Sequence, residues 1–167
     1  MCAICDGKSQ SEFLATLKNR IEVHGFTMVS VGDDHGSWTY TIGLTNTFDH
    51  PELVVTGLAP ESAYGLLDAL VDRIRTGEQF GATSHERFVH GAPVRFGEVH
   101  QGQWHQGRFD SWKRVYSSAA APPRQGAVQV VWPNDDWIYP PDPRFCMAHE
   151  NSCQALLDVD PCRRGAL

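Results

Sequence analysis

The residues of this sequence best suited to chemistry are His50 and Glu52, which flank Pro51. In an extended chain, side chains two residues apart lie on the same side, so the imidazole and the carboxylate could share a proton or a metal ion. A small enzyme could use them as a catalytic acid/base pair, with a bound flavin or a metal ion. In the alternative, structural interpretation, His50 makes local hydrogen bonds at the start of a strand and Glu52 points to water.

Small polar residues just before this pair could bind a ligand. The run from Trp38 to Leu44 alternates in type, so its large side chains share one face of a strand and its small ones share the other. The large face is expected to be core, whereas the small face is either solvated or open to a ligand. The residues predicted to contact a ligand at this edge are Thr39, Thr41, Gly43, Thr45 and Asn46.

Cysteines near the two ends of the chain form a third candidate group. Cys2 and Cys5 have the C-x-x-C spacing of one half of a tetrahedral zinc site. If the two ends of the chain meet, the remaining metal ligands could come from Cys146, His149 and Cys153. Such a site would clip the C-terminal tail to the first helix and stabilise the fold without doing chemistry. The alternative is free thiols.

A flavin is the second cofactor considered. Two strands with Thr, Gly and Asn at their junction are similar in pattern to flavin-binding split barrels, in which backbone amides and hydroxyls hold the phosphate and the ring edges. The sequence contains no G-x-G-x-x-G motif and no Gly-Lys-Ser/Thr phosphate loop. Zinc is therefore expected ahead of flavin.

The composition is that of one globular domain. The chain has 167 residues, of which 41% are hydrophobic and 20% are charged, so it can bury a core without disulfide or metal crosslinks. No window approaches the roughly 18 consecutive apolar residues that a membrane span requires. The first residues also lack the basic and apolar regions of a signal peptide. We therefore predict a cytoplasmic protein.

The charge balance bears on the kind of partner. The formal net charge of −6 disfavours nucleic acid, because phosphate recognition needs a concentrated basic surface. One local segment does interleave cationic and aromatic residues, among them Arg108, Trp112, Lys113 and Tyr116. It could stack on a nucleotide, but an amphipathic helix with a solvated cationic face is the favoured interpretation. The expected partner is a small molecule or another protein, and homo-oligomers are left open.

Helical spacing predicts two main helices. Ser9 and Glu12 form a capping box before an apolar repeat that ends near Gly25. Pro60 fits the first turn of a second helix with a continuous apolar stripe, and Gly77 ends it. Segment 78–92 is expected to be a loop or short helix, and a further helical segment is expected over about 108–118.

The remaining pattern predicts the sheet and the fold class. Alternating or apolar runs predict strands over residues 26–31, 38–44, 53–57, 92–100 and 127–132. We predict a single α+β domain over residues 1–140, with a mostly antiparallel sheet of about five strands and the two main helices against one face. An irregular, proline-rich C-terminal tail over 141–167 is expected to pack on it.

Several separated motifs occur along the chain, namely Cys2-x-x-Cys5-Asp6, His24-Gly25, Tyr40-Thr-Ile-Gly-Leu44, His50-Pro-Glu-Leu53 and Val131-Trp-Pro133. Together they resemble those of a bacterial family known only as domain-of-unknown-function 4262. The resemblance covers roughly residues 2–140 and brings no assigned activity with it. Because no complete catalytic signature is present, a non-catalytic ligand-binding or regulatory module is the favoured function. The small enzyme with the His50/Glu52 pair is the alternative.

Overall fold

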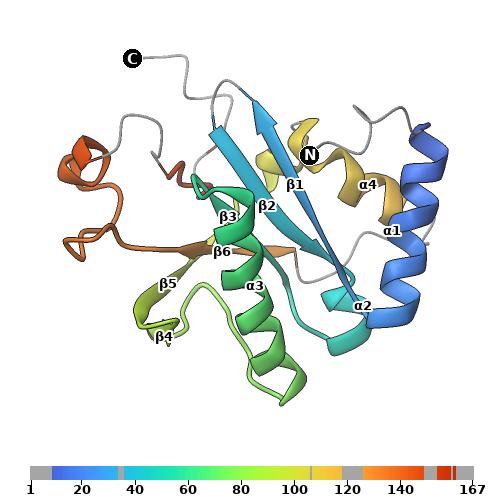
Figure 1. Ribbon diagram of the computed structural model, residues 1–167, viewed down its shortest axis with the longest axis horizontal. Coiled ribbons are helices and arrows are strands. Elements are labelled where there is room, and N and C mark those ends of the chain that lie inside the picture. Colours follow the sequence, from blue (N-terminus) through green and yellow to red (C-terminus); the bar gives the residue numbers. More distant parts are fainter. Residues whose placement is uncertain are drawn as a thin grey trace.

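The fold is built on one mixed sheet of six strands, in the order β1-β2-β3-β6-β5-β4. The computed structural model describes residues 9–33, 36–105, 107–117, 126–148, 154–158 and 160. Figure 1 shows the strongly twisted sheet with helices packed around it. The strands are β1 (Thr27–Asp33), β2 (Gly36–Ile42), β3 (Glu52–Thr56), β4 (Arg87–Val89), β5 (Ala92–Glu98) and β6 (Ala127–Val131).

Four of the five neighbouring strand pairs are antiparallel, and β3 and β6 form the parallel pair in the centre. In that pair, Glu52 lies opposite Ala127 and Val54 lies opposite Gln129. The α+β class and the mostly antiparallel sheet are therefore confirmed. The sheet is mixed because the chain returns to the centre of the sheet only with its last strand.

Helices cover both faces of the sheet. On one face, the apolar stripe of α3 packs against Leu53, Val55 and Val130. On the other, α1 and α4 pack against the side chains of β1 and β2. The prediction that both main helices share one face is wrong, because alternate residues of the central strands are apolar on both sides and each side needs a cover. The helices are α1 (Gln10–His24), α2 (Leu44–Phe48), α3 (Pro60–Arg75) and α4 (Asp110–Tyr116), with 3-10 turns at Gln101–His105, Gly107–Phe109 and Pro143–Ala148.

The boundaries of the two long helices follow from local chemistry. The Ser9 side chain accepts a hydrogen bond from the Glu12 amide, and the Glu12 carboxylate accepts one from the Ser9 amide. This capping box satisfies first-turn amides of α1. Pro60 begins α3 at the position where a missing amide proton costs no helical hydrogen bond. Both helices were predicted.

Two short elements were not predicted. Leu44 begins α2 instead of extending β2, because Gly43 has a φ of 118° and turns the chain. As a result Leu44 packs in the core of the α3 face and not with Trp38. Residues 87–89 form β4, which pairs with β5 through a two-residue turn at His90 and Gly91.

A segment near the C-terminus completes the second face. Leu157 is fully buried in the core that contains Trp38 and Tyr40. Its amide donates to the side-chain oxygen of Gln129 on β6, and its carbonyl accepts from the His100 amide. Residues 154–157 are thus fixed to the sheet through backbone groups. Within the described residues, no helix has both the length and the apolar character needed to cross a membrane.

Candidate functional site

Glu52 lies at the start of β3, and its carboxylate accepts hydrogen bonds from four groups. The Thr41 hydroxyl donates to Oε2 at 2.7 Å, and the Gly43 amide donates to Oε1 at 2.8 Å. The Tyr116 phenol and the Thr45 amide also donate to Oε1, at 2.5 and 3.4 Å. The side chain therefore joins β2, the turn into α2, β3 and α4 at one point.

The electrostatics of this network are those of a buried acid whose described hydrogen-bond partners include no cation. Glu52 is only 1% exposed, and burial raises its pKa, although the hydrogen bonds from Thr41, Tyr116, Gly43 and Thr45 lower it in part. Burial and the neighbouring carboxylate also raise the pKa of Tyr116, so its phenol keeps its proton and stays a donor. The network is compact and internally satisfied.

Gly43 is required by this arrangement. Its φ of 118° is a conformation that favours glycine. A Cβ at this position would lie 2.7 Å from the carbonyl oxygen of Gly25 and 3.0 Å from the Cα of Phe26. The turn from β2 into α2 therefore packs directly against the backbone between α1 and β1. This close approach holds the Gly43 amide where it reaches Glu52.

His50 belongs to a separate network. Its Nε2 accepts a hydrogen bond from the Phe80 amide at 2.9 Å, so the ring proton is on Nδ1, which donates to the Pro51 carbonyl at 2.6 Å. The ring is fully buried against Phe80, and burial lowers its pKa. Across the described part of the chain, no hydrogen bond connects the side chains of His50 and Glu52. Their catalytic role stays a prediction.

The structure places the predicted ligand contacts mostly inside the protein. Thr39 and Thr41 are 1% and 0% exposed, and Gly43 is also buried. Thr45 is half-buried with its hydroxyl bonded to the His50 carbonyl, and Asn46 is exposed. The expectation of a solvated or open face is therefore wrong for β2, because α3 covers that side of the strand. Whether these residues bind a ligand stays a prediction.

The predicted zinc site lies outside the described residues. This holds for Cys2, Cys5, His149 and Cys153, and for the side chain of Cys146. Among the residues that the structure describes, no group of three or more His, Cys, Asp or Glu side chains is placed to hold a metal ion. Zinc and flavin both stay predictions.

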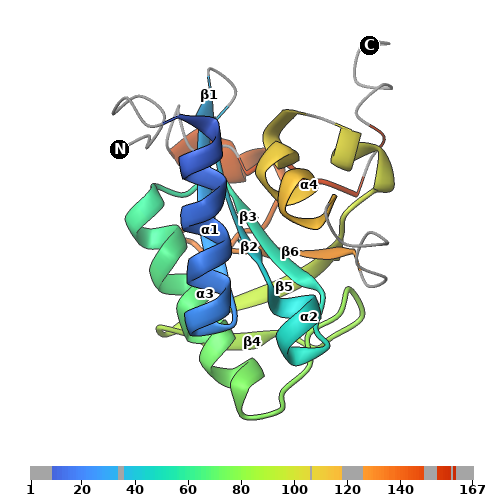
Figure 2. The same cartoon turned by 90° about the vertical axis from the view of Figure 1, so that its right-hand side faces the viewer.

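A cleft that the sequence analysis did not predict lies between α1, β1 and α3 and has a volume of about 490 Å³. Figure 1 shows α1 and α3 on either side of β1, and Figure 2 shows the same elements from the side. On the α1 wall, the side chains of Arg20 and His24 lie one turn apart. The α3 wall carries Tyr64, Asp68 and Arg75. The full lining is Arg20, His24, Phe26, Thr27, Met28, Tyr64, Asp68 and Arg75.

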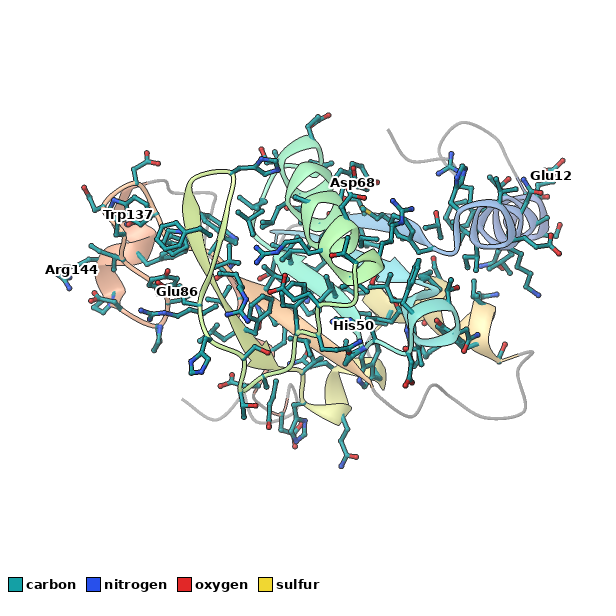
Figure 3. The ribbon with its side chains drawn as sticks, turned by 90° about the horizontal axis from the view of Figure 1, so that it is seen from below. Glu12, His50, Asp68, Glu86, Trp137 and Arg144 are labelled. Atoms are coloured by element: carbon teal, nitrogen blue, oxygen red, sulfur yellow. The ribbon has the colours of Figure 1, made fainter. Side chains whose placement is uncertain are left out.

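The charged side chains of the cleft differ in whether they have partners within the protein. Arg75 pairs with Asp72 at 2.9 Å, and its guanidinium stacks over the ring of Phe26 at 5.2 Å. Arg20 and Asp68 form no ion pair or hydrogen bond with any described residue. Figure 3 shows Asp68 near the outside of the molecule, in contrast to His50 among packed side chains. The cleft thus offers one positive and one negative group to a ligand.

Two further hollows lie on either side of the β4–β5 hairpin. One has a volume of about 470 Å³ and is mainly apolar, with Leu66, Val94 and Trp132 in its lining. The other, of about 480 Å³, contains the exposed rings of Phe88 and Trp137. Its charged groups already pair with each other, because Arg95 binds Glu86 at 2.9 Å. Neither hollow offers unpaired charges of both signs.

Comparison with known proteins gives one match. The family model described as "Domain of unknown function (DUF4262)" matches residues 20–146. The chain belongs to the DUF4262 family. The match confirms the resemblance seen in the sequence, and in this chain the DUF4262 segment contains the whole Glu52 network and all residues of the cleft. It begins after Cys2 and Cys5. No curated protein and no solved structure matches the chain.

A signal for the cleft was present in the sequence of this DUF4262 protein. Arg20 and His24 are four residues apart in α1, and Tyr64 and Asp68 are four apart in α3, so each pair lies on one helix face. Polar residues on a helix face are usually solvated, however, and nothing local indicates that the two faces meet across β1. That information comes only from the packing of the sheet.

Proposed function

We propose that this DUF4262 protein is a non-catalytic ligand-binding module and that a small polar organic molecule binds in the cleft between α1, β1 and α3. The observation that carries the proposal is the combination of a formed cleft of about 490 Å³ with charged groups that form no ion pair with any described residue. Small-molecule sites commonly have volumes of about 300–1,000 Å³ and a few placed polar groups in an apolar lining.

The lining of the cleft supports a ligand with both polar and apolar parts. Phe26, Thr27 and Met28 form the floor at the start of β1, with Phe26 buried and Met28 half-buried. Tyr64 is 38% exposed and stands on one wall. Burial raises the pKa of Tyr64, so its phenol can donate or accept a hydrogen bond at neutral pH. Charged groups stand above this floor.

The Glu52 network supports the non-catalytic part of the proposal. Its four donors come from three separate elements and all point to one carboxylate. A buried acid that is fully hydrogen-bonded within the fold serves to fix the chain, since its hydrogen bonds are already used. The hydrogen bonds of the His50 ring are also already used, because both ring nitrogens have backbone partners.

The proposal is tested by thermal unfolding of the protein with millimolar amino acids, carboxylic acids, amines, nucleosides and sugars, one compound at a time. A ligand that binds only the folded state raises the melting temperature. We expect at least one class to do so, and the effect to decrease in Tyr64→Ala or in Arg20→Ala. Arg114→Ala, on the exposed side of α4, is the matched control and should keep the full shift.

Two outcomes contradict the proposal. In the first, no compound of the panel stabilises the protein. In the second, a compound stabilises it to the same extent in wild type, Tyr64→Ala and Arg20→Ala, which places the binding site elsewhere.

A further inference from the structure

We infer that the ligand of the cleft is a zwitterion of the amino-acid type, with a carboxylate, a protonated amine and an apolar side chain. This inference rests on the proposed function, because it concerns the same cleft. Its basis is that Arg20 on α1 and Asp68 on α3 line one cleft and form no ion pair or hydrogen bond with each other or with any other described residue.

Arg20 is the group that would hold the carboxylate. Its side chain is exposed near the C-terminal half of α1 and lines the cleft. A guanidinium presents paired donors that match the two oxygens of a carboxylate. The other arginine of the cleft is less available, since Arg75 is bound to Asp72 and stacked on Phe26.

Asp68 is the group that would hold the amine. It is exposed on α3, one turn beyond Tyr64 and almost two turns before Arg75. A ligand with only a negative charge would meet an unfavourable carboxylate at this position. A ligand with a positive charge as well gains a partner there, so Asp68 favours zwitterions over simple anions.

The placement of the two charges on different helices supports this interpretation. Arg20 and Asp68 stand on opposite walls of the cleft without forming an ion pair. Nearby surface charges of opposite sign gain little by pairing in water, but a ligand that spans them gains both contacts at once. The carboxylate and amine of an amino acid provide this pair of charges on one small molecule.

The floor of the cleft accounts for the apolar side chain. Phe26 and Met28 belong to the core cluster of the α3 face or pack against it, and Tyr64 adds an aromatic ring at the wall. An apolar group placed there leaves water for a largely hydrocarbon surface. The charged end of the ligand then lies toward the solvent side, between the two helices.

Three compounds with the same phenyl group test the inference by isothermal titration calorimetry. L-Phenylalanine has both charges, 3-phenylpropionate lacks the amine, and 2-phenylethylamine lacks the carboxylate. We expect L-phenylalanine to bind at least about fivefold more tightly than either analogue, as expected when one charge-assisted contact is lost.

Two charge-removing variants connect each charge of the ligand to one residue. Arg20→Ala should weaken L-phenylalanine and 3-phenylpropionate about fivefold and leave 2-phenylethylamine unchanged. Asp68→Asn should weaken L-phenylalanine and 2-phenylethylamine and leave 3-phenylpropionate unchanged. Both side chains are exposed, so both variants should fold, and Arg114→Ala is the control that changes none of the three affinities.

The outcomes separate this inference from the proposed function. If 3-phenylpropionate binds as tightly as L-phenylalanine and Asp68→Asn has no effect, the inference that the ligand is a zwitterion is wrong. Ligand binding in the cleft through Arg20 would still stand. If none of the three compounds binds while another class stabilises the protein through Tyr64, the inference is again wrong and the proposed function stands. If no compound acts through the cleft, both are overturned.

Discussion

The end of the sheet at Glu52 and the cleft at Arg20 contain similar residue types and use them in opposite ways. At Glu52, a carboxylate, a phenol and a hydroxyl are buried and bonded to each other. In the cleft, a carboxylate, a phenol and a guanidinium lie on the surface, and Arg20 and Asp68 have no partner among the described residues. A polar group therefore indicates a binding site only where the fold has left its hydrogen-bonding capacity unused.

The largest effect is expected for Glu52→Ala. The substitution removes the acceptor of four donors, of which the Gly43 amide keeps a second acceptor in the Tyr116 phenol oxygen, and each buried donor left without a partner costs about 1–3 kcal/mol. We expect the free energy of unfolding to fall by about 4 kcal/mol in urea denaturation. Glu52→Gln keeps one oxygen for Gly43 and Tyr116 and should lose much less. Equal losses for the two variants would contradict the structural role of the carboxylate.

Gly43→Ala is expected to cost about 3 kcal/mol, because it combines an unfavourable φ with a Cβ only 2.7 Å from a backbone oxygen. Urea denaturation again measures the effect. Gly32→Ala in β1 is the matched control, since a Cβ there meets nothing within 4 Å. A Gly43→Ala protein as stable as the control would show that the turn into α2 is not tightly packed.

A smaller effect is expected from the pH dependence of His50. Because burial lowers its pKa in the folded state below the usual 6.5, the unfolded chain takes up a proton first as the pH falls. Stability is therefore full above pH 6.5 and decreases below it, by at most about 1.4 kcal/mol per pH unit. The slope from urea denaturation between pH 7 and 5 should decrease in His50→Gln. A slope in His50→Gln equal to that of the wild type would contradict this assignment.

The smallest effects are expected in the cleft. Arg20→Ala and Asp68→Asn remove exposed charges without described partners, so each should change the free energy of unfolding by less than about 0.5 kcal/mol. Urea denaturation in the absence of ligand checks this. If either variant lowers the free energy of unfolding by more than about 1 kcal/mol, the charge stabilises the fold. The cleft would then not differ from the Glu52 network in this respect.

Much of the fold could be predicted from local sequence. The capping box at Ser9 and the proline at residue 60 set the starts of the two long helices, and alternation identified the strands that pair around Tyr40. The sequence did not predict that the helices cover opposite faces. Which face each helix covers depends on how its apolar stripe packs against the assembled sheet, whose central strands are apolar on both sides.

The site was harder to predict for a physical reason. His50 and Glu52 were predicted as an acid/base pair, and that role stays a prediction, because hydrogen-bond partners such as Phe80 and Tyr116 lie far away in the sequence. Spacing alone cannot distinguish a carboxylate that binds a ligand from one that accepts backbone amides. Neither can spacing show that Arg20 and Asp68 line the same cleft, because they come from separate helices.

The central position of β6 also determines the order in which the protein can fold. Glu52 pairs with a residue 75 positions later, Ala127, so the contact that closes the sheet has a high sequence separation, which is typical of slowly folding domains. During synthesis, β3 and β5 each have one unpaired edge until residues 127–131 have left the ribosome and can pair with them. Any chain shortened before that point keeps two unprotected strand edges, which are templates for aggregation.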